Sequence, residues 1–189
     1  MARSYRTKPL RYKTATNAVA LVSKLRVIER RPRPGDTHAI SAKDIRLVLR
    51  ICPSEYIAGL RMIELRPRHD SNVGRPYGFY EGVEKRIVLY SLPMNWSFDF
   101  HISLKYRQSL ISSAARVMQT KDSTGIVWDK KEDRALWFFK DVLLHELAHH
   151  YCHQNRYRRK PASIHHEELL ADLYGSRIWT GIVSTMRRR

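Results

Sequence analysis

The sequence contains little cysteine, and its two cysteines are far apart. Cys52 and Cys152 lie in different halves of the chain, and neither belongs to a C-x-x-C pair. A zinc ribbon or a dithiol redox centre needs such pairs, so this sequence excludes both kinds of site. We expect a protein of a reducing compartment that folds without disulfides.

Long apolar runs are also missing. No stretch approaches the roughly 20 apolar residues of a membrane-spanning helix, and no apolar segment typical of a signal peptide follows the basic start. We therefore expect a soluble, cytoplasmic protein without a transmembrane segment. No acidic residue precedes Glu29, and the Arg-, Ser- and Thr-rich start overlaps in composition with transit peptides, so organellar import stays open.

Positive charge, by contrast, is abundant. The chain has 35 Lys and Arg against 18 Asp and Glu, which gives a formal net charge of +17 and a pI of about 10.3. Such a surplus attracts polyanions, so nucleic acid, ribosomes or anionic lipid are expected neighbours of the basic extensions at both ends. The sequence carries no nucleic-acid-binding signature, and the charge can also serve solubility alone.

The length predicts one main domain with a basic extension. A chain of 189 residues that is 43% hydrophobic can bury one core without disulfides. The prolines and glycine of RRPRPGD break any helix that precedes them. We place the boundary there, with a basic N-terminal arm or helix over 1–37 and the main domain over 38–189.

The first half of the main domain shows helix signals followed by strand signals. Ser41 opens a capping-box-like start, which predicts a helix that ends before Pro53 and a further turn over 54–60. The segment LRMIELR, 60–66, predicts a strand. The runs YGFYE and KRIVLYS flank Gly82 and predict a hairpin.

The second half is predominantly helical in pattern. We predict a helix over 102–119, a short strand over 124–128, a helix of five or six turns from about residue 133, and a last helix over 166–186. Strands followed by two long helices indicate an α+β fold. We expect a small antiparallel or mixed sheet packed on the two helices.

The first long helix contains an H-E-x-x-H motif formed by His145, Glu146 and His149. Residues four apart lie on one face of a helix, so both imidazoles can reach a single Zn²⁺. Glu146 lies about 100° around the helix, where it can act as general base on a metal-activated water. The pattern also occurs by chance, but here its neighbours are strongly apolar, namely Phe138, Phe139, Val142, Leu143 and Leu147.

A catalytic zinc needs a third protein ligand, and the last helix offers one. Its E-x-x-A-D string places Glu168 and Asp172 on one face. Glu168 is the favoured ligand, while Asp172 can accept the free N–H of a ligand histidine and so orient the ring. Glu167, His165 and His166 remain alternatives for the third position.

The spacing of these two motifs is similar to that of gluzincin peptidases, including HtpX-type and minimal gluzincin proteins. The resemblance covers about residues 133–180. The upstream strand and hairpin also resemble the small sheet of gluzincins and of ImmA/IrrE-like peptidases. The resemblance implies a zincin-like fold and a zinc metalloendopeptidase acting on proteins or peptides. Its zinc ligands would be His145, His149 and Glu168. Glu146 would act as general base and general acid, and Asp172 would hydrogen-bond to a ligand histidine.

The resemblance further implies that KRIVLYS is the edge strand along which an extended substrate docks. Backbone donors and acceptors at an open edge can pair with a peptide. The substrate-binding residues would then be Ile87, Val88, Leu89 and Tyr90.

Two competing interpretations follow from the same region. SprT-like proteases, which act on nucleic-acid-associated proteins, use a third histidine at a distance comparable to that of His165 or His166. Alternatively, a basic nucleic-acid- or ribosome-binding protein could hold a structural zinc closed by Cys152 or His153. On a continuous helix His153 stands about 12 Å from His145, too far for it to join both motif histidines on one metal. The metzincin pattern also fails, because Asn155 stands where its third histidine belongs.

Overall fold

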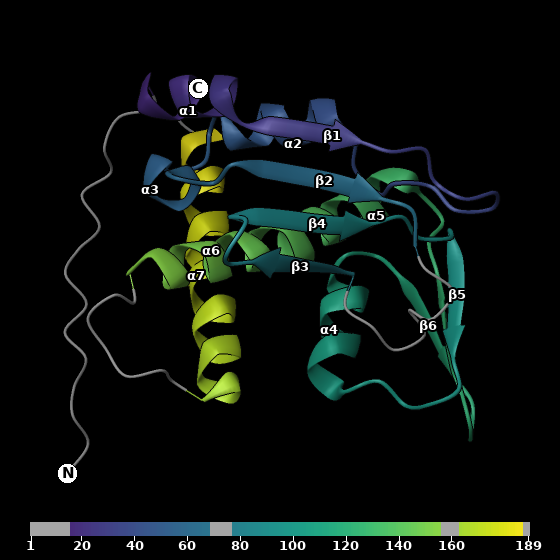
Figure 1. The fold of residues 1–189 in the computed structure, drawn as a ribbon. Helices are drawn as coiled ribbons and strands as arrows, with labels where there is room; N and C mark the ends of the chain where they lie inside the picture. The colour runs from purple at the N-terminus through teal and green to yellow at the C-terminus, as the bar shows by residue number, and fades with distance from the viewer. Residues whose placement is uncertain (1–15, 69–76, 156–162, 187–189) are drawn as a thin grey trace, which may run out of the picture.

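The computed structural model describes residues 16–68, 77–155 and 163–186 (Figure 1). The chain combines helices with two small sheets, so the α+β prediction is confirmed. Across these described stretches, no helix is both long and apolar enough to cross a bilayer.

The larger sheet is mixed and has four strands. They are β1 (Arg26–Glu29), β2 (Met62–Arg66), β3 (Gly78–Glu81) and β4 (Arg86–Tyr90). The strand order is β1-β2-β4-β3, in which β1, β2 and β4 run parallel and β3 pairs antiparallel with β4. The predicted strand over 60–66 and the predicted hairpin are both present.

The prediction that Ile87, Val88, Leu89 and Tyr90 form a substrate-docking edge is wrong. Strand β4 bonds to β2 on one side and to β3 on the other, so its backbone groups are already paired. The side chains of Ile87, Val88 and Leu89 are fully buried. Strand β3 occupies the edge instead, because the two parallel strands β1 and β2 add to the far side of the hairpin.

Residues before the predicted boundary at 37 belong to the same packed unit as the rest. Helix α1 (Thr16–Lys24) buries Ala18 and Val22 in the common core, and β1 is a strand of the mixed sheet. The expected separation of 1–37 from the domain therefore does not hold from residue 16 onward. Residues 1–15 lie outside the described residues.

Helix α2 (Ala42–Leu49) begins as the sequence predicts. Ser41 accepts a hydrogen bond from the Asp44 backbone N–H, and the Asp44 carboxylate accepts one from the Ser41 N–H. This reciprocal capping box satisfies two backbone donors that the first turn would otherwise leave unpaired. The short helix α3 (Ser54–Ile57) follows at the predicted further turn.

The predicted helix over 102–119 is wrong in its second half. Helix α4 (Leu104–Ser112) ends near Ala114, whose φ of 64° is left-handed and cannot continue an α-helix. The chain then forms β6 (Arg116–Gln119), which pairs with β7 (Thr124–Val127). Strand β5 (Asn95–Phe98), which the sequence did not predict, completes an antiparallel sheet of order β5-β7-β6.

The predicted long helix is present but is interrupted by a π-helical segment. It comprises α5 (Lys131–Trp137), the π-helix η2 (Phe138–Leu143) and α6 (Leu144–Asn155), and α7 (Ile164–Met186) is the predicted last helix. Inserted π turns are frequent at functional sites, and this one ends two residues before His145. The side chains of η2 that are buried are Phe138, Phe139, Val142 and Leu143.

The hydrophobic core lies between the mixed sheet and this helical run. Ile63 and Leu65 of β2 and Leu89 of β4 face Phe138 and Leu147, and all are almost fully buried. Burial of side chains this large contributes roughly 1.5 to 3 kcal/mol each. The core therefore fixes the helical run against one face of the sheet.

A buried carboxylate ties the strands together on the opposite face of the sheet. The Glu64 side chain is 2% exposed and accepts hydrogen bonds from Arg30 Nε at 2.5 Å and Arg66 Nη2 at 2.6 Å. Arg86 Nη1 lies 3.5 Å away. The Arg66 hydrogen bond, and then that of Arg30, lower the pKa of Glu64 against the opposing effect of burial.

We predict that Glu64→Gln lowers the free energy of unfolding by about 1 to 3 kcal/mol at pH 7, because charged hydrogen bonds are lost beside partly exposed arginines. The depressed pKa means that this stabilisation is complete above the unfolded pKa of about 4.3 and is lost as pH falls through the lower folded value. Urea unfolding at several pH values should show the gap between wild type and variant closing in acid. Glu84→Gln, in the exposed turn before β4, is the control. A gap that stays constant with pH would contradict the ionic role of Glu64.

Candidate metal centre

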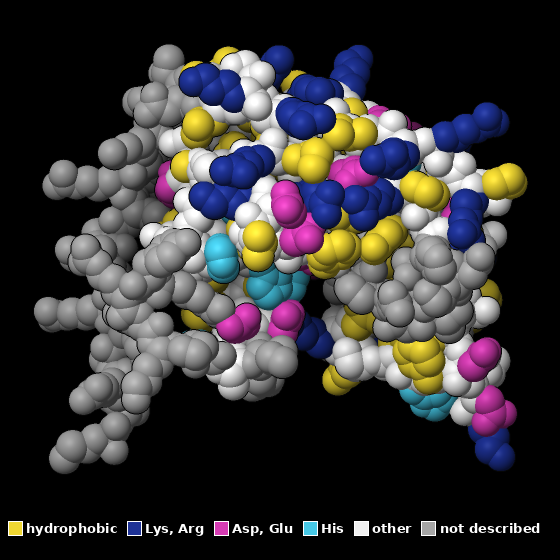
Figure 2. All heavy atoms as spheres, in the orientation of Figure 1, with side chains coloured by type: hydrophobic (Ala, Val, Ile, Leu, Met, Phe, Trp, Pro, Cys, Tyr) yellow, Lys and Arg dark blue, Asp and Glu magenta, His cyan; other side chains and the backbone are white. Residues whose placement is uncertain are grey.

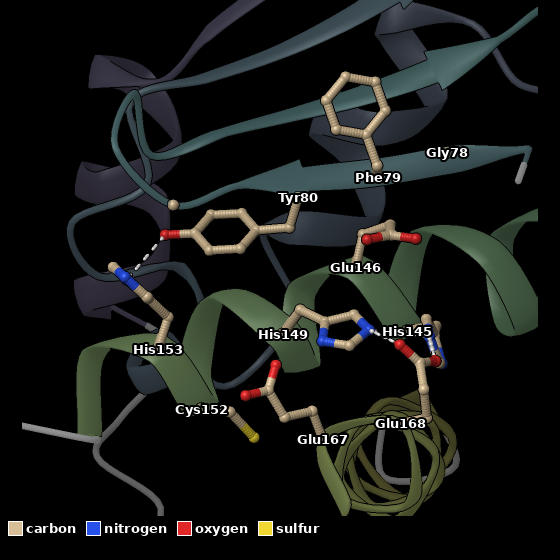
Figure 3. Close-up of a pocket in the computed structure, with 11 residues that line it drawn as sticks. Gly78, Phe79, Tyr80, His145, Glu146, His149, Cys152, His153, Glu167 and Glu168 are labelled. Carbon is tan, nitrogen blue, oxygen red and sulfur yellow. Dashed lines mark hydrogen bonds and ion pairs between the residues drawn. The ribbon is translucent and has the colours of Figure 1, made fainter. Parts of the chain in front are cut away.

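The two motif histidines lie one turn apart on α6. Their Nε2 atoms are 3.0 Å apart, and the rings are set at 80° to each other. Leu144, Leu147 and Ala148 on the same helix are fully buried, so the polar motif is carried by a helix anchored in the core. The histidine side chains are about one-fifth exposed, at 21% and 19%, and point out of that core into a cleft (Figure 3).

Helix α7 brings Glu168 to both rings. Its Oε2 lies 3.1 Å from His145 Nε2, and its Oε1 lies 3.4 Å from His149 Nε2. Zinc held at about 2.0 to 2.1 Å by tetrahedral ligands keeps neighbouring ligand atoms ~3.3 Å apart. His145, His149 and Glu168 are also the group of described side chains whose ligand atoms converge closely enough to hold a metal ion.

The hydrogen bond behind His145 defines what its ring can do. Asp172 Oδ1 lies 3.2 Å from His145 Nδ1, so the Nδ1–H donates to the carboxylate and Nε2 keeps its lone pair. In the neutral ring this tautomer directs the Nε2 lone pair at the Glu168 carboxylate, so both groups can donate electron pairs to one cation placed between them. The donor set and its orientation therefore fit a divalent metal. Lys105 Nζ forms an ion pair with the other oxygen of Asp172.

Glu146 lies between α6 and the edge strand. Its side chain is buried at 7% exposure and faces the same cleft as the ligands. Burial raises the pKa of Glu146 to about 8, a hydrogen bond from the backbone N–H of Tyr80 opposes the rise, and the nearby Glu168 carboxylate adds to it. A carboxyl group whose pKa lies near neutral pH can both accept a proton and return it.

The cleft has a volume of about 410 Å³ and is lined by residues of β3, α6 and α7. In Figure 2 histidine and acidic side chains surround a hollow below the mixed sheet, and Figure 3 shows β3 lying along its upper side. The backbone N–H and C=O groups of Gly78 and Tyr80 point away from β4, since Tyr77 is bonded to Tyr90 and the pattern alternates. A Cβ at position 78 would lie 2.9 Å from the Val88 carbonyl, so this strand needs glycine there.

Among the described side chains, the other candidates for the third ligand do not join the two motif histidines. Glu167 lines the cleft, but its carboxylate is not among the converging atoms. His166 is exposed, and the side chain of His165 lies outside what the structure describes. His153 Nδ1 lies 3.4 Å from the Tyr80 hydroxyl, on the far side of the cleft.

Sequence reasoning missed the residues that β3 contributes. Tyr80 lines the cleft, holds Glu146 through its backbone and contacts His150 Nδ1 through its hydroxyl at 3.1 Å. His150, fully buried, also lies 3.0 Å from the Ala58 carbonyl through Nε2, and burial lowers its pKa. The hairpin pattern was visible in the sequence, but it did not show which strand would be the edge.

Comparisons with known proteins add no relative to this description. No family model matches the chain, and neither the curated proteins nor the solved structures contain a match. The geometry of the cleft is therefore the basis for any assignment.

We predict that Glu168→Ala weakens zinc binding far more than Glu167→Ala, because the Glu168 oxygens lie 3.1 and 3.4 Å from the two rings and, among the described side chains, Glu168 belongs to the converging group and Glu167 does not. Isothermal titration of the chelator-stripped protein with Zn²⁺ measures both affinities. Equal affinities in the two variants would remove Glu168 from the ligand set. His166→Ala serves as a second control.

We predict that Asp172→Asn weakens zinc binding by roughly 10- to 100-fold while the fold persists, because an amide holds the His145 tautomer less well than a carboxylate. Competition with a fluorescent zinc chelator provides the readout. Asp133→Asn, in the first turn of α5, is the matched control, and an unchanged affinity for Asp172→Asn would show that the contact does not support the ligand.

Proposed function

We propose that this protein is a zinc-dependent metalloendopeptidase of the zincin-like type. The convergence of His145, His149 and Glu168 in a cleft that also holds Glu146 supports this assignment most strongly. The order of the mixed sheet supports it as well, because its open edge lies beside the candidate ligands. The substrate would be an extended segment of a protein or peptide.

Each residue of the cleft has a distinct part in this proposal. His145, His149 and Glu168 would hold the zinc, and Asp172 would keep the ring of His145 in place. When bound, zinc supplies a Lewis acid that polarises the scissile carbonyl and lowers the pKa of water to about 7. Glu146 would take the proton from the attacking water and return it to the leaving amine.

The edge strand β3 would position the peptide. Its outward backbone groups can extend the sheet by one further strand, with the scissile bond carried past Glu146. In the structure the outward N–H of Tyr80 already donates to Glu146, so Gly78 and the Tyr80 carbonyl offer the remaining contacts. The strand therefore serves both the peptide and the general base.

The two competing interpretations have less support from the geometry. A structural zinc needs a fourth protein ligand, and among the described side chains Cys152 and His153 line the cleft without joining the converging group. The SprT-like alternative needs a histidine where the structure places Glu168. Cleavage of proteins bound to nucleic acid would still be compatible with the proposed ligand set.

We predict that Glu146→Gln keeps stoichiometric zinc but lowers turnover of an unfolded protein substrate by roughly 10²- to 10⁴-fold, because the amide cannot carry the proton. Zinc content by mass spectrometry and cleavage of labelled casein measure the two properties. Glu167→Gln, which alters a carboxylate in the same cleft, should lose far less activity. Full turnover in Glu146→Gln would reject the mechanism.

A further inference from the structure

The mixed sheet has a face that the packed helices leave open. Helices α5, α6 and α7 lie behind the sheet in Figure 1, and alternate side chains of each strand point to the other side. Ile28, Met62, Phe79 and Tyr90 are partly exposed there and lie outside the hydrophobic core. The strand register places three rows across this face, one of Arg26, Met62 and Arg86, one of Ile28, Glu64, Val88 and Phe79, and one of Arg30, Arg66 and Tyr90. Glu64 and Val88 in the middle row are buried beneath their neighbours, and the outer two rows carry the arginines.

The outer rows of this face carry more cations than anions. Four arginines, Arg26, Arg30, Arg66 and Arg86, share the face with the carboxylates of Glu64 and Glu81. Each guanidinium has five N–H donors, so those already paired with a carboxylate keep donors for a further anion. The Glu64 hydrogen bonds hold the Arg30 and Arg66 side chains in place and so preorganise them.

The charge of the described chain is concentrated in this part of the molecule. Residues 16–68 and 77–92 contain 13 Lys and Arg against 7 Asp and Glu, whereas 93–155 and 163–186 contain 9 against 10. In Figure 2 the Lys and Arg side chains gather over the region where Figure 1 shows the mixed sheet and α2. The part of the chain that forms the open face therefore attracts polyanions more strongly than the rest of the described chain.

Aromatic rings stand beside these arginines. The centroids of Phe79 and Tyr90 are 6.2 Å apart, and Tyr90 is the direct neighbour of Arg66 across the strands. An acidic polypeptide would satisfy the guanidinium groups, but it has no planar group that requires the rings. A single-stranded nucleic acid has both phosphates for arginine and bases that stack on aromatic side chains.

We infer that the open face of the mixed sheet binds single-stranded nucleic acid, with arginine donors on phosphates and Phe79 and Tyr90 against bases. This binding is independent of the proposed peptidase chemistry. It should persist in Glu146→Gln and in chelator-treated protein, so a failed peptidase assay and a failed binding assay have different meanings.

Titration of the full chain with a short fluorescein-labelled oligothymidylate at several salt concentrations tests the electrostatic part. Each phosphate contact with a single strand contributes about 0.7 to the slope of log affinity against log salt. Arg30→Gln combined with Arg86→Gln should lower that slope by about 1.4, whereas Lys130→Gln combined with Lys131→Gln, two exposed cations at the start of α5, should leave it unchanged. Equal slopes for the two double variants would overturn the inference.

A second pair of variants tests whether bases stack on Tyr90 and so distinguishes nucleic acid from an acidic polypeptide. Tyr90→Leu should weaken binding by roughly 5- to 100-fold even in high salt, because stacking is not screened. Phe100→Leu, which changes an exposed ring in the region of the second sheet, should have no effect. If Tyr90→Leu binds normally and polyglutamate displaces the oligonucleotide at equal charge, the face recognises acidic polypeptides and the nucleic-acid assignment is wrong.

Discussion

The packing of α6 between the mixed sheet and α7 is the constraint on which the candidate centre depends. One side of α6 lies against β3, which places Glu146 beside the Tyr80 backbone. Another side lies against α7, where the fully buried Ala171 stands between Glu168 and Asp172. A shift of either contact would separate groups that now lie within 3.4 Å, so the core of the domain also sets the geometry of the ligands.

This dependence explains which features of the site the sequence could predict. His145 and His149 follow from the helical period alone, and Glu168 and Asp172 follow from a second helix with the same period. Their close approach was an expectation from motif spacing, and the geometry of α7 agrees with it.

The failed predictions all concern pairing between distant segments. Local patterns located β4 but could not show that β1 and β2 would occupy one of its sides, so the edge was assigned to the wrong strand. The segment 113–119 has a helical composition of apolar and polar residues, yet Ala114 adopts a left-handed φ and β6 pairs with β7. Strand order and tertiary pairing override local propensity in such cases.

Strand β3 borders both the cleft and the open face of the mixed sheet. Its alternation sends Tyr80 toward α6 and Phe79 toward the open side, although Phe79 still contributes to the lining of the cleft. A nucleic acid held against Phe79 on the open face would therefore lie over the same strand at whose edge a peptide could pair. Proteins bound to the same nucleic acid would be concentrated near the cleft, which raises their effective concentration without requiring any sequence-specific contact in the cleft. Selectivity would then come from where a substrate is bound rather than from the shape of the cleft.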